Sequence, residues 1–273
     1  MENERTLGKI SANLINKLYN ENKYIFKIND VQSITNKNYN ETTDLLSKLV
    51  KRKVISRLKS GKFLIIPQEI GTIENYIGNW YVAAREIVNS PDYYIAFYSA
   101  MHYWGMLTQP LIKIWIATPQ RQIVPREMKN KLVFVIINNK FIWGVKEEWV
   151  TKTEKIRISD LEKTIVDGVF HPQYCGGITE IAKGIWLTKD KINYKLLKEY
   201  IQKYNKPIIA KRTGYILEIL KINQPELISE LKNYVRDRYD IFDPVLPAKN
   251  INKNNWRLID NIGRQQILNI VGK

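Results

Sequence analysis

The sequence predicts an α+β protein with two domains: a winged helix-turn-helix domain over residues 1–68, and a larger mixed α/β domain over 69–273 with a partly antiparallel sheet. Three observations support this prediction. The chain has 273 residues, more than most single domains hold. Helical periodicity at the N-terminus gives way to two short β segments around Ser60-Gly61. A second series of strand-like and helical segments then follows.

The N-terminal helices are predicted from the spacing of apolar residues. These recur every three or four positions from Arg5 to Leu18, which is the pattern of an amphipathic helix. An extended piece at Tyr24 to Phe26 separates this helix from a second one that begins near Asp30.

A third helix is predicted to begin at Asn38. Asn38 with Glu41 three residues later has the pattern of a capping box, in which each side chain bonds the backbone N–H of the other residue. Leu46 and Leu49 then supply a buried stripe. Because the turn at residues 36–38 joins the second and third helices closely, the pair predicts a helix-turn-helix.

The wing is predicted from "VISRLK" (54–59) and "KFLIIP" (62–67). They read as two strands joined by Ser60-Gly61, whose glycine tolerates a positive φ. Leu58 and Phe63 can face the helices while cations project along the hairpin. The order of helix, helix-turn-helix and hairpin is that of a winged helix.

The chain is strongly basic, with 43 Lys+Arg against 27 Asp+Glu and a formal net charge of +16. Residues 1–68 hold 13 Lys+Arg and 6 Asp+Glu, a net of +7, while the other 205 residues carry +9. Such a balance predicts attraction to polyanions. Charge is densest where the motif lies, which favours double-stranded DNA as the partner. The alternatives are a solvated basic hairpin and a protein-interaction module.

A recognition helix reads base edges with its N-terminal half, while nearby cations contact phosphates. The candidate base readers are Asn40, Thr43 and Ser47. The candidate phosphate contacts are Lys48, Lys51, Arg52, Arg57, Lys59 and Lys62. Asp44 lies on the same helix face and counts against this interpretation, because its carboxylate repels phosphate.

The second domain is predicted to start with a linker, "PQEIGT" (67–72), and a helix over 73–88. The aromatic run from Tyr93 to Trp104 predicts a buried core helix. Strand-like segments follow at 112–118, 131–137 and 140–145. Asn138-Asn139 predicts a hairpin between the last two, so part of the sheet is expected to be antiparallel.

The segment "RISDLEKTIVDGV" (157–169) carries three carboxylates, Asp160, Glu162 and Asp167. Ser159 followed by Glu162 has the pattern of a capping box, which explains the segment more simply than a metal site does. The glycines of "CGGITEI" predict a turn into a helix, because no P-loop Lys-Ser/Thr follows them. No zinc site, Ser-His-Asp set or dinucleotide fingerprint is present, so we expect no cofactor.

Two amphipathic helices are predicted towards the C-terminus, over 192–204 and 211–220, with lysines between and along them. This basic cluster has three interpretations: a further DNA-contacting face, a site for a nucleotide or partner, or a solvated surface. The proline-punctuated tail with Trp256 predicts an extended arm laid over the core. Cys175 is the only cysteine, and the N-terminus lacks an apolar signal segment, so we expect a cytoplasmic protein without a membrane span.

Four segments in this order resemble the AbiEi-type antitoxins, a family of transcriptional regulators of viral defence systems: "SRLKSGKFLIIP", "YYIAFYSAMHYWGMLTQ", "ISDLEKTIVDGVFHPQYCGGITEI" and "KRTGYILEIL". The similarity covers most of the chain. It marks a candidate functional surface on the second domain: Asp160, Glu162, Asp167, Gly176, Gly177, Arg212, Gly214 and Tyr215. Such domains usually place a glycine between recognition helix and wing, where Lys53 stands here, so we expect strain at Lys53 or a different helix end.

The resemblance implies an antitoxin of a type IV toxin–antitoxin pair in phage defence. The N-terminal domain would bind inverted repeats upstream of its own operon, as a homodimer, and repress it. The second domain would counter a nucleotidyltransferase-like toxin, and whether the two proteins touch is left open. We expect a non-catalytic protein. The alternative is a metal-dependent nuclease that uses Asp160, Glu162 or Asp167 and is targeted to DNA by the winged helix.

Overall fold

The computed structural model describes residues 7–67, 76, 78–88, 90–124, 128–247 and 252–272. The chain is a mixed α+β protein that divides into two compact units. The first comprises residues 1–89 with 123–130, and the second comprises 90–122 with 131–273. The predicted boundary after residue 68, and all of the predicted linker beyond Pro67, lie outside the described residues.

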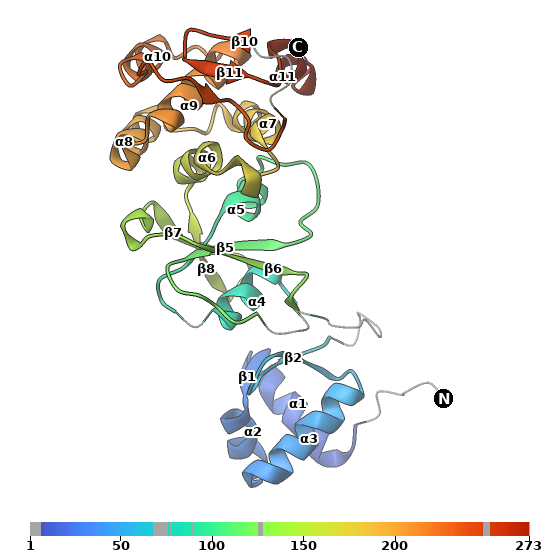
Figure 1. The fold of residues 1–273 in the computed structure, drawn as a ribbon. Helices are drawn as coiled ribbons and strands as arrows, with labels where there is room; N and C mark the ends of the chain where they lie inside the picture. Colours follow the sequence, from blue (N-terminus) through green and yellow to red (C-terminus); the bar gives the residue numbers. More distant parts are fainter. Residues whose placement is uncertain are drawn as a thin grey trace. The chain divides into compact units, whose positions relative to one another are not determined.

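The first unit contains, in chain order, α1 (Lys9–Asn20), β1 (Ile25–Lys27), α2 (Ile28–Thr35), α3 (Tyr39–Lys51), β2 (Ile55–Lys59), β3 (Lys62–Ile65) and α4 (Trp80–Ile87) (Figure 1). The strands form an antiparallel sheet in the order β1-β3-β2. Phe26 of β1 and Phe63 of β3 stack with their ring centroids 6.0 Å apart. They are buried with Leu14, Leu18 and other side chains that the three helices contribute. The predicted helices and hairpin are therefore present.

The ends of α3 follow from two local features. Asn38 Oδ1 accepts a hydrogen bond from the Glu41 N–H at 3.0 Å, and Glu41 Oε2 accepts one from the Asn38 N–H at 3.2 Å, so the predicted capping box is confirmed. At the other end Lys53 adopts a φ of +55°. The residue therefore occupies the left-handed conformation that a glycine would adopt with less strain.

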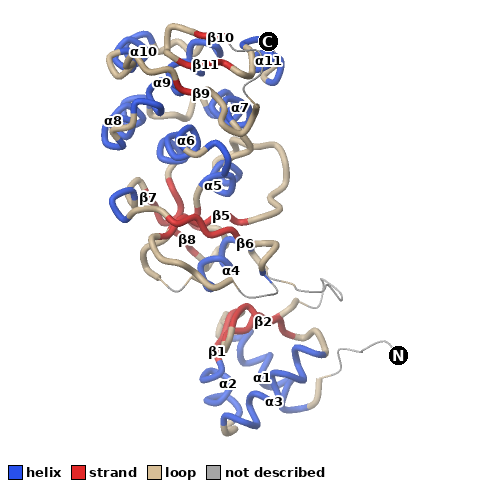
Figure 2. The backbone as a smooth tube through the Cα atoms, in the orientation of Figure 1, coloured by secondary structure: helices blue, strands red, loops and turns tan. Residues whose placement is uncertain are grey.

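The second unit is built on a mixed five-stranded sheet (Figure 2). Its strands are β4 (Tyr94–Ile95), β5 (Ile114–Thr118), β6 (Leu132–Ile136), β7 (Val145–Trp149) and β8 (Lys155–Ser159), in the order β6-β5-β4-β8-β7. The β4–β5 and β7–β8 pairs are antiparallel, and the β4–β8 and β5–β6 pairs are parallel. The expectation of a partly antiparallel sheet is confirmed.

Three details of that sheet differ from the prediction. The hairpin expected at Asn138-Asn139 is wrong, because β6 pairs in parallel with β5 and the short helix η3 (Asn139–Phe141) follows it. The antiparallel hairpin is instead β7–β8, and no strand was predicted at β8, whose last residue Ser159 was interpreted as a helix cap. The predicted core helix over 93–104 begins with strand β4, and only α5 (Phe97–Tyr103) is helical.

Six α-helices, α5 to α10, accompany the sheet in the described part of the second unit before its C-terminal segment. After α5 come α6 (Leu161–Phe170), α7 (Ile178–Thr188), α8 (Tyr194–Tyr204), α9 (Pro207–Leu220) and α10 (Pro225–Lys232). Helix α6 contacts α5, α7, α8 and α9, so nearly all of its side chains are buried (Figure 1). The segment with three carboxylates is thus the central helix of this unit.

The C-terminal tail is more structured than an extended arm. It forms β9 (Asp240–Ile241), β10 (Asn252–Lys253) and β11 (Leu258–Asp260), which make a small sheet in the order β10-β11-β9, and then helix α11 (Arg264–Ile270). Trp256 is buried, with 1% of its surface exposed. Its indole lies directly over Gly214 of α9, where any Cβ would overlap the ring.

Within the described residues, every helix is too short or too polar to cross a bilayer.

Candidate nucleic-acid interface and the marked residues of the second unit

Helix α3 presents two different faces. Thr42, Leu46 and Leu49 are buried in the core of the first unit. Asn40, Ser47, Lys48, Lys51 and Arg52 are exposed, and Thr43 is half-buried. The polar face therefore contains all three predicted base readers and three of the predicted phosphate contacts.

Two of the predicted base readers differ in what they can offer a ligand. The Thr43 hydroxyl donates to the backbone oxygen of Asn40 at 2.8 Å, so its proton is used within the helix and the oxygen is left as an acceptor. The Asn40 side chain is exposed in the first turn of α3. Asp44 is exposed as well, which keeps a carboxylate near this surface.

The three cations of the hairpin lie in different surroundings. Arg57 is exposed, with its guanidinium carbon 5.6 Å from the Phe63 ring centroid. Lys59 is half-buried, and burial together with the nearby charge of Lys62 lowers its pKa. Lys62 forms an ion pair with Glu86 of α4. Lys62 is thus a structural cation, and Arg57 is the hairpin residue best placed to contact phosphate.

The residues marked on the second unit do not form a surface. Asp160, Glu162 and Asp167 have exposed fractions of 2%, 5% and 1%, and Arg212 and Tyr215 are also buried. Gly214 is covered by Trp256, and Gly177 is buried. Gly176 alone of the eight is exposed. These residues therefore do not form the expected functional surface. The buried ones make contacts that stabilise the core.

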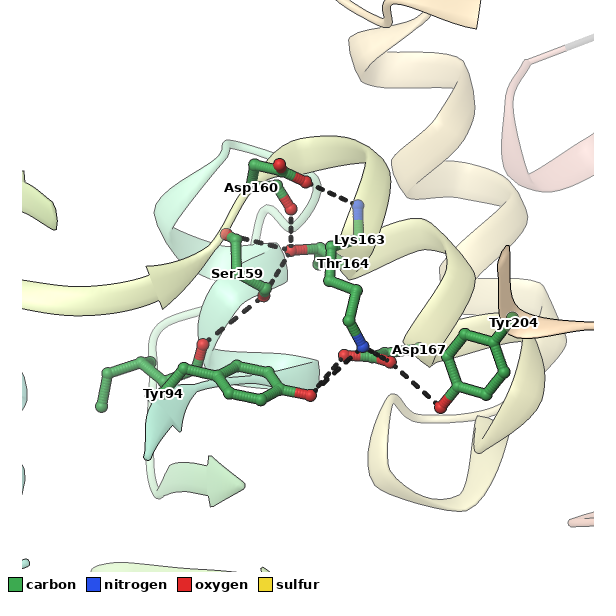
Figure 3. Close-up of polar contacts among 8 residues, drawn as sticks. Tyr94, Ser159, Asp160, Lys163, Thr164, Asp167 and Tyr204 are labelled. Atoms are coloured by element: carbon green, nitrogen blue, oxygen red, sulfur yellow. Dashed lines mark hydrogen bonds and ion pairs between the residues drawn. The ribbon is translucent and has the colours of Figure 1, made fainter. Parts of the chain in front are cut away.

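Asp160 is the N-cap of α6, so the capping box predicted from Ser159 and Glu162 is wrong. Its Oδ1 accepts from the Lys163 N–H at 2.8 Å, and its Oδ2 accepts from the Tyr200 hydroxyl at 2.8 Å. Burial raises the pKa of Asp160. Ser159, the predicted cap, is instead the last residue of β8, and its hydroxyl lies 2.8 Å from that of Thr164 (Figure 3).

Asp167 belongs to a buried ion pair that the sequence analysis did not identify. Its carboxylate contacts Lys163 Nζ, and it accepts hydrogen bonds from the hydroxyls of Tyr94 at 2.9 Å and Tyr204 at 3.4 Å (Figure 3). Lys163 has no exposed surface, and its Nζ lies 4.6 Å from the Trp143 ring centroid. Aromatic rings and one carboxylate thus take the place of water around this cation.

The geometry weakens the nuclease alternative. Both oxygens of Asp167 and both of Asp160 are engaged by protein donors, and these carboxylates are shielded from solvent. Within the described residues, no three His, Cys, Asp or Glu side chains come together in an arrangement that could hold a metal ion. A hydrolytic metal site needs carboxylate oxygens open to both metal and substrate.

Two of the remaining marked residues, Arg212 and Tyr215, lie on α9 and bond to the C-terminal segment. Arg212 donates to the backbone oxygens of Val169 at 2.6 Å and Ile241 at 3.0 Å, and burial lowers its pKa to about 10. Tyr215 donates to Asp260 Oδ2 at 2.8 Å.

Gly177, with a φ of +91°, leaves room for Asp243 to accept from the first N–H of α7 at 2.8 Å. Any Cβ at Gly177 would lie 2.8 Å from that carboxylate oxygen. The glycine pair therefore leaves room for the carboxylate that caps α7, and it does not form a phosphate-binding loop.

Comparisons with known proteins show a fold. The chain matches no protein-family model and no curated protein sequence. Among solved structures it is similar to the crystal structure of the RV2827C protein from Mycobacterium tuberculosis, with a TM-score of 0.73 and 14% sequence identity. The alignment covers 100% of this chain and 98% of that one. At this identity the likeness establishes a shared fold alone.

Proposed function

We propose that the first unit is a winged helix-turn-helix module that binds double-stranded DNA, and that the protein is an autorepressor and antitoxin of a phage-defence toxin–antitoxin system. The observation that carries the DNA-binding proposal is the two-sided character of α3. One face is locked into the core by Leu46 and Leu49, and the other is polar, cationic and exposed.

The arrangement suits the major groove. An α-helix fits that groove and reads base edges with side chains of its first turns, where Asn40, Thr43 and Ser47 lie. Strand β2 contacts α3, so the β2–β3 hairpin accompanies the helix. Arg57 on this hairpin is exposed and can contact the phosphate backbone or the adjacent minor groove.

The phosphate contacts are assigned by exposure. Lys48, Lys51, Arg52 and Arg57 are exposed and are proposed to bind phosphates. Lys59 is retained as a weaker candidate because it is half-buried, and Lys62 is removed because it pairs with Glu86. Four phosphate contacts predict that log K falls with log salt concentration with a slope of about −3.6 per protomer.

The antitoxin part of the proposal rests on the resemblance of the sequence segments. The second unit would counter a nucleotidyltransferase-like toxin encoded beside this gene. Because the marked residues of this unit stabilise its core, they are proposed to maintain the fold that the antitoxin activity requires. Any surface that meets the toxin is made by other residues.

DNA binding is tested by gel-shift titration with the upstream region of the gene against a random duplex of equal length. Wild type is expected to prefer the upstream region. Lys48→Ala with Lys51→Ala is expected to weaken binding at least tenfold and to reduce the salt slope by about 1.8. Lys9→Ala with Lys17→Ala, on exposed positions of α1, removes the same charge and serves as the matched control.

Two outcomes would overturn the assignment. Equal affinity of the wild type for both duplexes would remove the specific-repressor function. An equal loss in the α3 pair and the α1 pair would show that net charge, and not the α3 surface, drives binding.

The antitoxin function is tested by co-expression with the product of the adjacent reading frame. Growth should be arrested by that protein alone and restored by wild type. The Lys48→Ala, Lys51→Ala variant should restore growth equally well, because the proposed DNA contacts are not part of the antitoxin activity. Failure of wild type to restore growth would contradict the antitoxin proposal and leave the DNA-binding result unaffected.

A further inference from the structure

A cavity in the second unit is lined by one of the marked residues, Glu162, together with side chains that belong to neither group described above. It has a volume of about 580 Å³ and is lined by residues from the end of α5, the start of α6, the start of α8 and strand β7. Its size is within the range of small-molecule sites. Among the residues that line it are Tyr103, Trp104, Lys146, Glu162, Lys191 and Asn193.

Two cations enter the cavity from different elements. Lys146 is contributed by β7 and Lys191 by the loop before α8, and both are exposed. Neither forms an ion pair with a carboxylate in the described part of the chain. The charge of Lys146 acts on the buried Asp160 without an ion pair being formed. Two lysines that converge on one cavity and form no ion pair suit a phosphorylated ligand.

A buried carboxylate lines the same cavity. Glu162 is 5% exposed, and its Oε1 accepts a hydrogen bond from the Asn193 N–H at 2.7 Å. This bond fixes the side chain and leaves Oε2 as an acceptor. An acceptor beside two cations selects a ligand that carries both anionic groups and an N–H donor.

Aromatic rings complete the lining. Tyr103 and Trp104 meet edge to face, with centroids 5.1 Å apart, and the Trp104 Nε1 donates to the backbone oxygen of Ser159 at 2.7 Å. The indole is thus held by its polar edge. A planar heterocycle gains from packing against such a ring.

We propose that this cavity binds a nucleoside phosphate, with phosphates on Lys146 and Lys191, an amino group of the base on Glu162 Oε2, and the base against Trp104. The proposal concerns a mononucleotide and does not rest on the DNA-binding or antitoxin functions. A nucleotide site was one of the three interpretations of the basic cluster predicted towards the C-terminus. The cavity gives such a site a position.

The test is isothermal titration of the full-length protein with ATP in 150 mM salt (about the physiological ionic strength). Saturable binding at one site per chain is expected. Lys146→Ala with Lys191→Ala should weaken it at least tenfold. The matched control is Lys152→Ala with Lys206→Ala, two exposed lysines of the same unit that do not line the cavity, and it should change affinity less than twofold.

The role of Glu162 is tested with two ligands that differ by one group. ATP should bind more tightly than purine riboside triphosphate, which lacks the amino group. Glu162→Gln retains an oxygen for the Asn193 N–H and should abolish this preference. The same variant should bind inorganic tripolyphosphate at least as tightly as wild type does, because a negative charge is removed.

Absence of saturable ATP binding to wild type would overturn the proposal. An equal loss in the two lysine pairs would also overturn it, since binding would then reflect general attraction of a basic protein for polyanions. A preference for ATP that survives Glu162→Gln would overturn the placement of the base.

Discussion

Lys62 of β3 and Glu86 of α4 form an ion pair in which both side chains are mostly buried, with exposed fractions of 17% and 16%. Arg85 also contacts Glu86, with its Nη2 2.7 Å from Oε1. Burial alone would raise the pKa of Glu86, but the hydrogen bond and charge of Lys62, with the contribution of Arg85, lower it. The pair therefore connects the proposed wing to the helix that follows it.

We predict that Lys62→Met lowers the free energy of unfolding by about 1.5–3 kcal/mol, the usual contribution of a hydrogen bond to a charged group. The variant should also lose less stability on acidification than wild type does. Without Lys62 the pKa of Glu86 is lowered less, and a carboxylate contributes acid-sensitive stability only when its pKa is lowered, with the loss occurring as pH falls from the ordinary value of 4.5 through that pKa. Urea denaturation between pH 3 and 7 measures both effects. Lys62→Met should reduce DNA affinity less than Arg57→Ala does. A larger loss for Lys62→Met than for Arg57→Ala would show that Lys62 contacts phosphate after all.

The buried pair of Lys163 and Asp167 should behave differently from a surface salt bridge. Lys163→Met leaves Asp167 as a buried charge that the Tyr94 and Tyr204 hydroxyls stabilise only in part, so we predict a loss of about 3–5 kcal/mol. Lys163→Met combined with Asp167→Leu should lose less, because no unpaired charge remains. Urea denaturation followed by circular dichroism compares the variants. Equal losses in the single and double variants would show that packing, and not the charge, dominates.

His171 predicts a pH dependence of stability. It lies at the end of α6, its ring centroid is 4.4 Å from that of Phe170, and burial lowers its pKa below the ordinary value of 6.5. The unfolded chain then binds the proton more tightly than the folded one. The stabilisation is present above pH 6.5 and is lost as pH falls from 6.5 through the lowered pKa.

The measurement for His171 is a series of thermal unfolding midpoints between pH 7.5 and 5. The wild-type midpoint should fall over this range, and His171→Gln should remove part of that fall. Identical profiles for the two proteins would show that other groups account for it.

Gly214 and Trp256 should show strong energetic coupling. Gly214→Ala places a methyl group where the indole lies, and we predict a loss of about 3 kcal/mol or more, at the upper end of overpacking effects. Trp256→Ala should cost about 3–5 kcal/mol because it leaves a cavity. The double variant should lose clearly less than the sum, since each change accommodates the other. Additive losses in urea denaturation would contradict the direct contact.

Local signals in the sequence predicted local structure well. Asn38 and Glu41 lie three residues apart and form their capping box without any help from the rest of the chain. The same reasoning placed the start of α6 at Ser159 in place of Asp160, because both residues can cap a helix. The choice is made by β8, whose pairing with β7 extends to Ser159. Such pairing depends on residues that a local pattern does not include.

Non-local pairing also explains the larger errors. Asn138-Asn139 has the composition of a hairpin turn, yet β6 pairs with β5 and not with β7. Lys62 appeared to be one more cation of the hairpin because its partner lies 24 residues further on. Lys163 and Asp167 are four residues apart on one helix, so their pairing could have been predicted. Its complete burial could not, because Tyr94 and Tyr204 come from distant segments.

The division of the chain has a practical consequence for dissecting this protein. Residues 123–130 belong to the first compact unit although they are flanked on both sides by residues of the second. The polypeptide therefore passes from one unit to the other three times, and no single cut releases the first unit whole. An expression clone that stops at residue 89 would lack this insertion, so DNA-binding assays belong on the intact chain or on a chimaera that grafts the eight residues back.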